Sequence, residues 1–345
     1  MKGILMVNLG SPESPTAKDV KPYLDEFLID KYVIDYPYIL RALLVKGIIL
    51  RSRPKASAEA YEKIWWEEGS PLIVLSRRLK EAVTAKLSAP VALAMRYGKP
   101  SLEEGLDELA AKGVDHVLVV PLYPQYAMAT TRTIVEKTEE IRSRKFPFML
   151  MEHFAPFYNK PEYARVLSQS IKDALNGFQY DHILFSYHGV PERHIRKTDP
   201  TGSHCHIDSE CCSLKSTAHQ FCYRHQCYET TRAVAEILKL PAERYSVTFQ
   251  SRLGRDKWLE PYTDKRIAAM PAEGIKNLAV VTPAFVSDCI ETLEEIAMRA
   301  KDDFLGNGGK NFITIPCLND REDWTDAVAG WISDWIDETT QTMHT

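Results

Sequence analysis

The sequence predicts an α/β fold built from two similar halves, because short apolar runs alternate with segments of helical periodicity along the chain. Eight apolar runs have the length of buried strands, and they divide four and four. This division favours two parallel four-stranded sheets with a cleft between the halves. A chain of 345 residues is long enough for about two such domains. The expected strands are 4–8, 91–95, 116–121, 148–152, 182–185, 245–249, 278–281 and 312–315.

The connecting segments carry apolar residues at helical spacing, as expected of βαβ units. We expect a first domain over 1–154 and a second over 155–320, since Ala155-Pro156-Phe157 has the composition of a boundary. Residues 321–345 are expected to contain a C-terminal helix, at about 324 to 340, for which the sequence allows a return onto the first domain. The other expected helices are 57–68, 75–87, 129–142, 162–175, 230–238 and 288–299.

The composition excludes several classes of protein. Hydrophobic residues make up 45% and charged residues 26%, as in soluble globular proteins, and a net charge of −4 offers no general attraction to nucleic acid. The first apolar run is too short for a secretory signal, and no apolar stretch is long enough for a spanning helix. We therefore expect a cytoplasmic protein, where thiols stay reduced.

Nucleotide chemistry is not expected, although the strand and helix pattern is Rossmann-like. The loop after the first strand, 8–12, contains no G-x-G-x-x-G, and the chain has no G-x-x-x-x-G-K-[ST] phosphate loop. The glycine cluster 306–309 precedes a strand, which is the wrong place for a pyrophosphate. The sequence thus predicts no nucleotide cofactor.

His188 is the first candidate for catalysis. It follows the apolar run 183–185, and Gly189 and Pro191 predict a turn directly after it. The residue is therefore expected beyond the carboxyl end of a buried strand, where open α/β sheets bind ligands. An imidazole there can accept a proton or hold a metal near neutral pH. For an isolated histidine, a turn residue bonded to backbone is the plainer alternative.

A row of acids follows the seventh expected strand. Asp288, Glu291 and Glu295 recur at i, i+3 and i+7, which places them on one face of a helix. Helix capping alone explains acids in a first turn. Because this strand is also expected to be parallel, the row can face His188, and oxygen and nitrogen ligands together suit a divalent ion.

Other strand ends add aromatic and cationic side chains to the same expected rim. Arg96 and Tyr97 follow the second strand, Tyr126 lies after the third, and a segment leading to Trp258 follows the sixth. Such a rim fits a large flat ligand that carries acids, together with a metal. The apolar segment 27–50, flanked by basic residues, is either a core helix or an exposed surface suited to a membrane or a flat hydrophobic ligand.

Six segments together resemble ferrochelatases, in the family's order and over nearly the whole chain. The resemblance implies two Rossmann-like domains with a porphyrin in the cleft between them, and insertion of Fe²⁺ to form haem. It also implies that His188 and Glu291 are the central active-site pair. The segments are Asn8-Leu9-Gly10-Ser11-Pro12, Tyr123-Pro124-Gln125-Tyr126, the run from Ser186 to His194, Phe249-Gln250-Ser251-Arg252, the run from Lys257 to Tyr262, and Glu291-Thr292-Leu293.

The resemblance also suggests roles for the neighbouring residues. His188 and Glu291 share metal delivery and pyrrole deprotonation, with Asp288 and Glu295 as further ligands of the substrate iron or as proton carriers. The apolar segment 27–50 corresponds to the family's lip at the porphyrin entrance, which favours a functional surface and a peripheral contact with the inner membrane surface. The expected porphyrin contacts are Arg96, Tyr97, Tyr126, Ser186 and Trp258.

Alternatives remain at this stage. Protoporphyrin IX is the expected substrate, but coproporphyrin III or another divalent metal fits the same residues. A solute-binding protein would need an export signal, and a haem carrier would not need the acid row. One departure from the family occurs at Cys289, where some members have histidine, so any metal role at that position is in doubt.

The segment 198–227 is an insert with chemistry of its own, since it holds five of the seven cysteines. Clustered thiolates suit zinc or an iron–sulfur cluster, and a reducing compartment disfavours disulfides. Some ferrochelatases carry a 2Fe–2S cluster bound by four cysteines, and the resemblance favours that group here. The expected ligands are Cys205, Cys212, Cys222 and Cys227, with Cys211 as a substitute for Cys212, while His204, His206, His219 and His225 keep zinc open.

Overall fold

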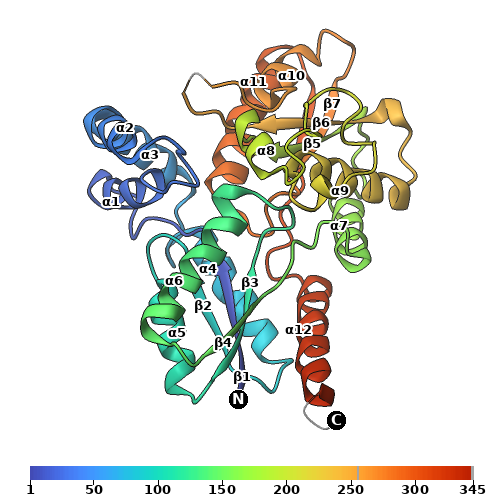
Figure 1. Cartoon of the computed structure of the whole chain (residues 1–345). Helices are drawn as coiled ribbons and strands as arrows, with labels where there is room; N and C mark the ends of the chain where they lie inside the picture. Colours follow the sequence, from blue (N-terminus) through green and yellow to red (C-terminus); the bar gives the residue numbers. More distant parts are fainter. Residues whose placement is uncertain (255, 343–345) are drawn as a thin grey trace. The chain divides into compact units, whose positions relative to one another are not determined.

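The computed structural model describes residues 1–254 and 256–342, which form two compact units (Figure 1). Unit 1 contains residues 1–122 and 128–156 and the segment that begins at Asn319. Unit 2 contains residues 123–127 and 157–318. Each unit is therefore assembled from segments that are distant in the sequence.

The sheet of unit 1 has the strand order β2-β1-β3-β4, and all its strands are parallel. The strands are β1 (Lys2–Asn8), β2 (Val91–Met95), β3 (His116–Pro121) and β4 (Leu150–His153). Every residue of β2 and β3 is buried, because helices cover both faces of the sheet. This burial explains why these strands are continuous apolar runs in the sequence.

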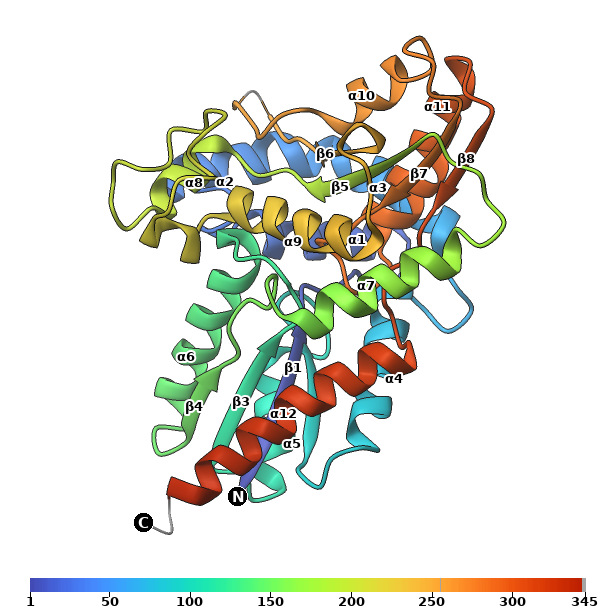
Figure 2. The ribbon, with the colours of Figure 1, turned by 90° about the vertical axis from the view of Figure 1, so that its right-hand side faces the viewer.

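Helices α5 (Leu102–Ala111) and α6 (Thr133–Lys145) cover one face of this sheet, and α4 (Pro71–Thr84) and α12 (Glu322–Thr342) cover the other (Figure 2). A π-helical turn, η2 (Met128–Arg132), precedes α6. The start of the chain holds α12 in place: Lys2 Nζ donates hydrogen bonds to the carbonyls of Trp335 and Ile336, at 2.9 and 2.6 Å.

The segment between β1 and β2 also contains α1 (Ala17–Leu28), α2 (Tyr38–Leu44), the π-helix η1 (Val45–Ile49) and α3 (Leu50–Ile64). α1 begins where the side chain of Thr16 accepts a hydrogen bond from the Asp19 amide, and it packs against α3. α3 begins seven residues before the helix start predicted at 57, because the helical path continues from η1 without interruption.

The sheet of unit 2 has the order β6-β5-β7-β8, which repeats the order of unit 1 with all strands parallel. The strands are β5 (His182–His188), β6 (Tyr245–Gln250), β7 (Asn277–Val281) and β8 (Asn311–Thr314). Helices α7 (Pro161–Ala174) and α9 (Tyr223–Leu238) pack together, while α10 (Thr263–Ala269), the π-helix η5 (Glu291–Ala300) and α11 (Lys301–Gly306) form another layer. Short helices α8 (Glu192–Thr198), η3 (Thr217–Gln220) and η4 (Ala242–Arg244) lie in the connections.

The predicted α/β fold with two parallel four-stranded sheets is confirmed. The cleft expected between the two halves stays a prediction, as do the domain boundaries. Besides α3, two further segments differ clearly from the predicted helices: α9 begins at Tyr223 and not at 230, and the region predicted as an ordinary helix over 288–299 contains a ten-residue π-helix. Within residues 1–254 and 256–342, no helix combines the length and the apolar character needed to cross a membrane.

Candidate active site

The site lies in unit 2, where the chain leaves two neighbouring strands in opposite directions. The connection after β5 leads to β6 on one side, and the connection after β7 leads to β8 on the other. Open parallel sheets bind ligands at such a switch point, beyond the carboxyl ends of the strands. His188 is the last residue of β5, and Glu291 begins the π-helix that follows β7. Both predicted central residues therefore belong to this edge of the sheet.

The turn after β5 fixes the imidazole of His188. Its Nδ1 lies 2.6 Å from the carbonyl oxygen of Gly189, and a carbonyl can only accept, so Nδ1 carries the proton. In the neutral ring Nε2 is then the acceptor nitrogen. The side chain is half-buried, and the ring of Phe285 lies edge-on to it at 6.3 Å between centroids.

Glycine is required at 189 because the turn approaches β6 closely. A Cβ there would lie 2.9 Å from the Gln250 carbonyl oxygen and 3.3 Å from the ring of Trp258. The Gly189 amide also donates to the Gln250 carbonyl at 2.6 Å. The structure thus places Trp258, a predicted porphyrin contact, against the turn that carries His188.

The π-helix η5 supplies the acidic part of the site. Glu291 and Glu295 are half-buried, and Ser251 Oγ donates a hydrogen bond to Glu295. Burial raises the pKa of Glu295, and the negative charge of Glu291 adds to this effect, while the Ser251 hydrogen bond and a charge on His188 oppose it. π-helical turns are frequent at functional sites.

Gln250 joins the two parts of the site. Its side-chain oxygen accepts from Ser186 Oγ at 2.8 Å, and its side-chain nitrogen donates to the backbone carbonyl of Glu291 at 3.0 Å. The next residue, Ser251, has a φ of 60°, a left-handed conformation that is uncommon for serine. Sequence reasoning missed Gln250 as a site residue, since a buried amide has no pattern of its own.

Two of the predicted site residues have buried side chains that bond to neighbouring residues of the protein. Ser186 is fully buried, and its hydroxyl lies between Gln250 and Thr263. Asp288 is also buried: its Oδ1 accepts from Thr292 Oγ1 at 2.8 Å and from the Cys317 amide at 3.4 Å. The contacts of Asp288 link the first turn of η5 to the segment after β8.

Tyr126 lies beside the cysteine-rich insert. Its ring meets Phe221 edge-on at 5.2 Å, and its backbone amide donates to the side-chain oxygen of Gln226 at 2.6 Å. The structure therefore brings Tyr126 to α9, and its contact with a porphyrin stays a prediction.

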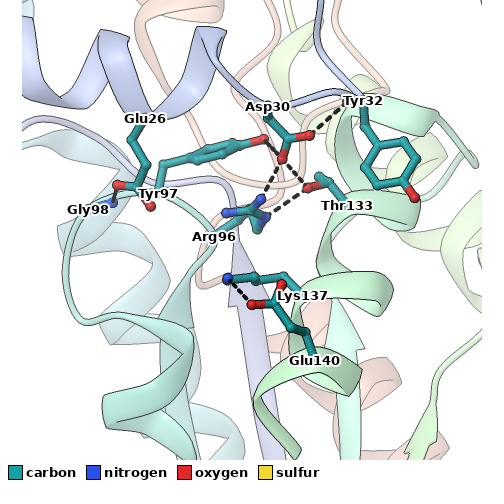
Figure 3. A network of polar contacts seen from close by, with 9 residues as sticks. All are labelled: Glu26, Asp30, Tyr32, Arg96, Tyr97, Gly98, Thr133, Lys137 and Glu140. Atoms are coloured by element: carbon teal, nitrogen blue, oxygen red, sulfur yellow. Dashed lines mark hydrogen bonds and ion pairs between the residues drawn. The ribbon is translucent and has the colours of Figure 1, made fainter. Parts of the chain in front are cut away.

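Arg96 and Tyr97 belong to a buried polar network in unit 1 (Figure 3). Asp30 lies at its centre and accepts hydrogen bonds from Arg96, from the Tyr97 hydroxyl at 3.0 Å, from Thr133 and from the Tyr32 amide. Burial and the Asp30 charge raise the pKa of Tyr97 well above its usual range. Arg96 and Tyr97, which were predicted to contact the porphyrin, thus bond to Asp30 near the start of the segment 27–50. Sequence reasoning missed Asp30, whose signal was a single acid within an apolar run.

The insert brings its cysteines together as free thiols. Cys205, Cys211, Cys222 and Cys227 are buried, and Cys212 is half-buried. Hydrogen bonding to the Cys205 thiol is the main effect that raises the pKa of Cys222, to about 12. Cys212 also bonds to Cys222, and Arg224 Nη1 lies 3.3 Å from Cys212 Sγ.

The thiols suit a metal or cluster in number and chemistry. Three of them, however, are linked to one another by hydrogen bonds, with Cys222 between Cys205 and Cys212. In the part of the chain that the structure describes, no group of three or more histidine, cysteine, aspartate or glutamate side chains has an arrangement that holds a metal ion. The donor set of the insert therefore fits a four-thiolate group in composition, and the contacts place Cys205 and Cys212 against Cys222.

The fold is shared with solved structures of a metal chelatase. Two solved structures of SirB from Bacillus subtilis share the fold: one with Fe³⁺, with a TM-score of 0.55 and 14% identity over 96% of this chain and 94% of that one, and a sirohydrochlorin chelatase in complex with cobalt, with a TM-score of 0.53 and 12% identity over 94% and 91%.

The sequence comparisons identify the family. The ferrochelatase family model matches residues 1–335. Curated ferrochelatases of Pseudomonas fluorescens SBW25 and Azotobacter vinelandii are 49% and 50% identical, over 94% of this chain and 95% and 96% of theirs. The chain belongs to the ferrochelatase family, and it is an enzyme that inserts Fe²⁺ into a porphyrin to form haem.

Proposed function

We propose that His188 and Glu291 carry out metal insertion, with protoporphyrin IX as the porphyrin. The observation that carries this proposal is the open acceptor nitrogen of His188 at the same sheet edge as the acids of η5. Nδ1 is bound to the Gly189 carbonyl, so Nε2 is the atom available to substrate. The fixed tautomer of His188 distinguishes it from a histidine whose two nitrogens are both engaged in the fold.

The reaction requires the loss of two pyrrole protons as the metal enters the ring. His188 Nε2 accepts one of them, and a positioned general base contributes about 10²- to 10⁴-fold in such transfers. Glu291 and Glu295 supply oxygen ligands for the incoming Fe²⁺ or receive protons, and the raised pKa of Glu295 suits a proton carrier.

The test is the His188→Ala variant. We expect it to fold and to bind porphyrin, and to lose metal insertion by about 10²-fold or more. Insertion is followed anaerobically by the metalloporphyrin spectrum, and porphyrin binding by fluorescence. The matched control is His182→Asn at the other end of β5, where the side chain bonds to Ser246 Oγ at 2.8 Å. Normal turnover by His188→Ala would refute the assignment.

Coproporphyrin III and other divalent metals remain the alternatives for the same site. Comparison of kcat/KM for the two porphyrins with Fe²⁺ decides between them.

We further propose that the insert binds a 2Fe–2S cluster through Cys205, Cys212, Cys222 and Cys227. The support is the burial and contact of these thiols, and the proximity of Arg224 to Cys212, which favours a thiolate. Anaerobically purified protein is expected to be coloured and to hold about two iron atoms per chain beyond any substrate iron. A colourless protein that contains zinc would point to a tetrahedral zinc site, which His204, His219 and His225 would then border.

We also propose a cytoplasmic enzyme that contacts the inner membrane surface through α2 and η1. Five apolar side chains of this segment are more than half exposed, and Lys46 lies among them. Apolar side chains next to cations are typical of surfaces that bind membranes peripherally. The exposed residues are Tyr38, Ile39, Leu40, Leu43 and Ile48.

A further inference from the structure

Tyr223 connects the cysteine-rich insert to the catalytic turn. It is the first residue of α9, directly after Cys222, which caps the helix by accepting from the His225 amide. Its side chain is buried, and its hydroxyl donates to the backbone carbonyl of His188 at 2.8 Å. None of the roles described above accounts for this contact.

The hydroxyl acts on one particular peptide unit. The His188 carbonyl and the Gly189 amide belong to the same planar peptide. The amide is held by the Gln250 carbonyl at 2.6 Å, and the carbonyl is held by Tyr223. The peptide plane is therefore fixed from both sides.

The orientation of this peptide determines where the next carbonyl lies. That next carbonyl belongs to Gly189, and it accepts the proton of His188 Nδ1 at 2.6 Å. If the peptide rotates, the Gly189 carbonyl leaves Nδ1, and the neutral imidazole can place its proton on either nitrogen. A proton on Nε2 removes the acceptor that faces substrate.

We propose that Tyr223 is a positioning residue, which holds the His188–Gly189 peptide so that the imidazole keeps its proton on Nδ1 and its Nε2 open. The inference rests on the proposed role of His188 as proton acceptor. Tyr223 does not touch the substrate in this account, and it acts only through the turn.

Tyr223→Phe tests the inference, because it removes one oxygen atom from the protein. The substitution leaves the buried His188 carbonyl without its donor, so the peptide is no longer held in one orientation. We expect kcat to fall about tenfold and KM for porphyrin to change less than about twofold. The ¹⁵N spectrum of His188, assigned by its absence in His188→Asn, is expected to change from one tautomer to a mixture. Introduction of 4-aminophenylalanine at 223 restores a donor and is expected to recover most of the activity.

Tyr187→Phe is the matched control. Tyr187 is equally buried, and its hydroxyl also reaches α9, where it bonds to Thr231 Oγ1 at 2.8 Å. This variant loses the same kind of hydrogen bond without touching the His188 carbonyl, so its kcat and its His188 spectrum are expected to match the unmodified enzyme.

The metal content of the insert separates a positioning role from a structural one, since Tyr223 lies next to Cys222 and near Cys227. Iron and zinc per chain are expected to be unchanged in Tyr223→Phe. The inference is overturned if metal content falls in step with kcat, if both tyrosine variants lose equal activity, or if the His188 tautomer is unaffected. If His188→Ala is active, the proposed function itself fails. If it is inactive while Tyr223→Phe is normal, only this inference fails.

Discussion

At the scale of single residues, Asp30 shows how one buried charge organises a segment. Its side chain is only 4% exposed, and that of Arg96 is 12% exposed. Such a pair is costly to bury and costly to break, because either partner alone is a desolvated charge. Three other donors also converge on Asp30: the Tyr97 and Thr133 hydroxyls reach the same oxygen as Arg96, Oδ2, and the Tyr32 amide reaches Oδ1 (Figure 3).

We therefore expect Asp30→Asn to lower the free energy of unfolding by about 3–5 kcal/mol, since Arg96 stays buried without its counter-charge. Urea denaturation measures the change. Glu68→Gln is the control, because the Glu68–Arg78 pair is exposed and should contribute only about 0–1 kcal/mol. Equal effects of the two variants would mean that the Asp30 network is not a stabilising element.

The same residue marks a limit of prediction from sequence. The places of His188 and Glu291 in the fold could be predicted, because each follows an apolar strand. Asp30 and Tyr223 could not, because their roles depend on which donors and acceptors the fold brings to them. Tyr223 meets the carbonyl of a residue 35 positions earlier, and periodicity contains no information about that contact.

At the scale of elements, strands were predicted better than helices. The strands 91–95 and 116–121 coincide with β2 and β3, because burial on both faces leaves a continuous apolar run with polar ends. The π-helix η5 could not be predicted, because π-helices are rare and an α-helix is the default expectation for a segment of helical spacing. The start of α9 was placed too late because its first two turns carry Cys227 of the insert and several polar residues.

The element formed by α2 and η1 allows a direct test of membrane contact. Each inserted Leu or Ile contributes about 1.5–3 kcal/mol, so the double variant Ile39→Glu and Leu43→Glu is expected to weaken binding to anionic lipid vesicles by more than about tenfold. Vesicle co-sedimentation measures the binding. Phe148→Glu is the control, since Phe148 is 94% exposed in the connection before β4. Unchanged binding of the double variant would exclude this surface as the membrane contact.

At the scale of the whole molecule, the two units repeat one strand order but have separate cores. The core of unit 2 lies between the sheet and its outer helices, and it includes Phe304, Leu184 and Ile296. In unit 1, the C-terminal helix α12 carries the fully buried Trp324 and packs against α4, which lies on the sheet next to β2. The end of the chain therefore stabilises its beginning.

This arrangement predicts that core substitutions act on one unit at a time. Trp324→Ala and Phe304→Ala each remove a fully buried aromatic side chain, and each is expected to cost about 3–5 kcal/mol. Hydrogen exchange resolves where the cost falls. Trp324→Ala should lower the protection of β1 and β3 and leave β5 and β7 unchanged, although it lies close in sequence to unit 2. Phe304→Ala should do the reverse. Loss of protection in all four strands by either variant would show that the two sheets unfold as a single cooperative body, and the repeated strand order would then have no counterpart in stability.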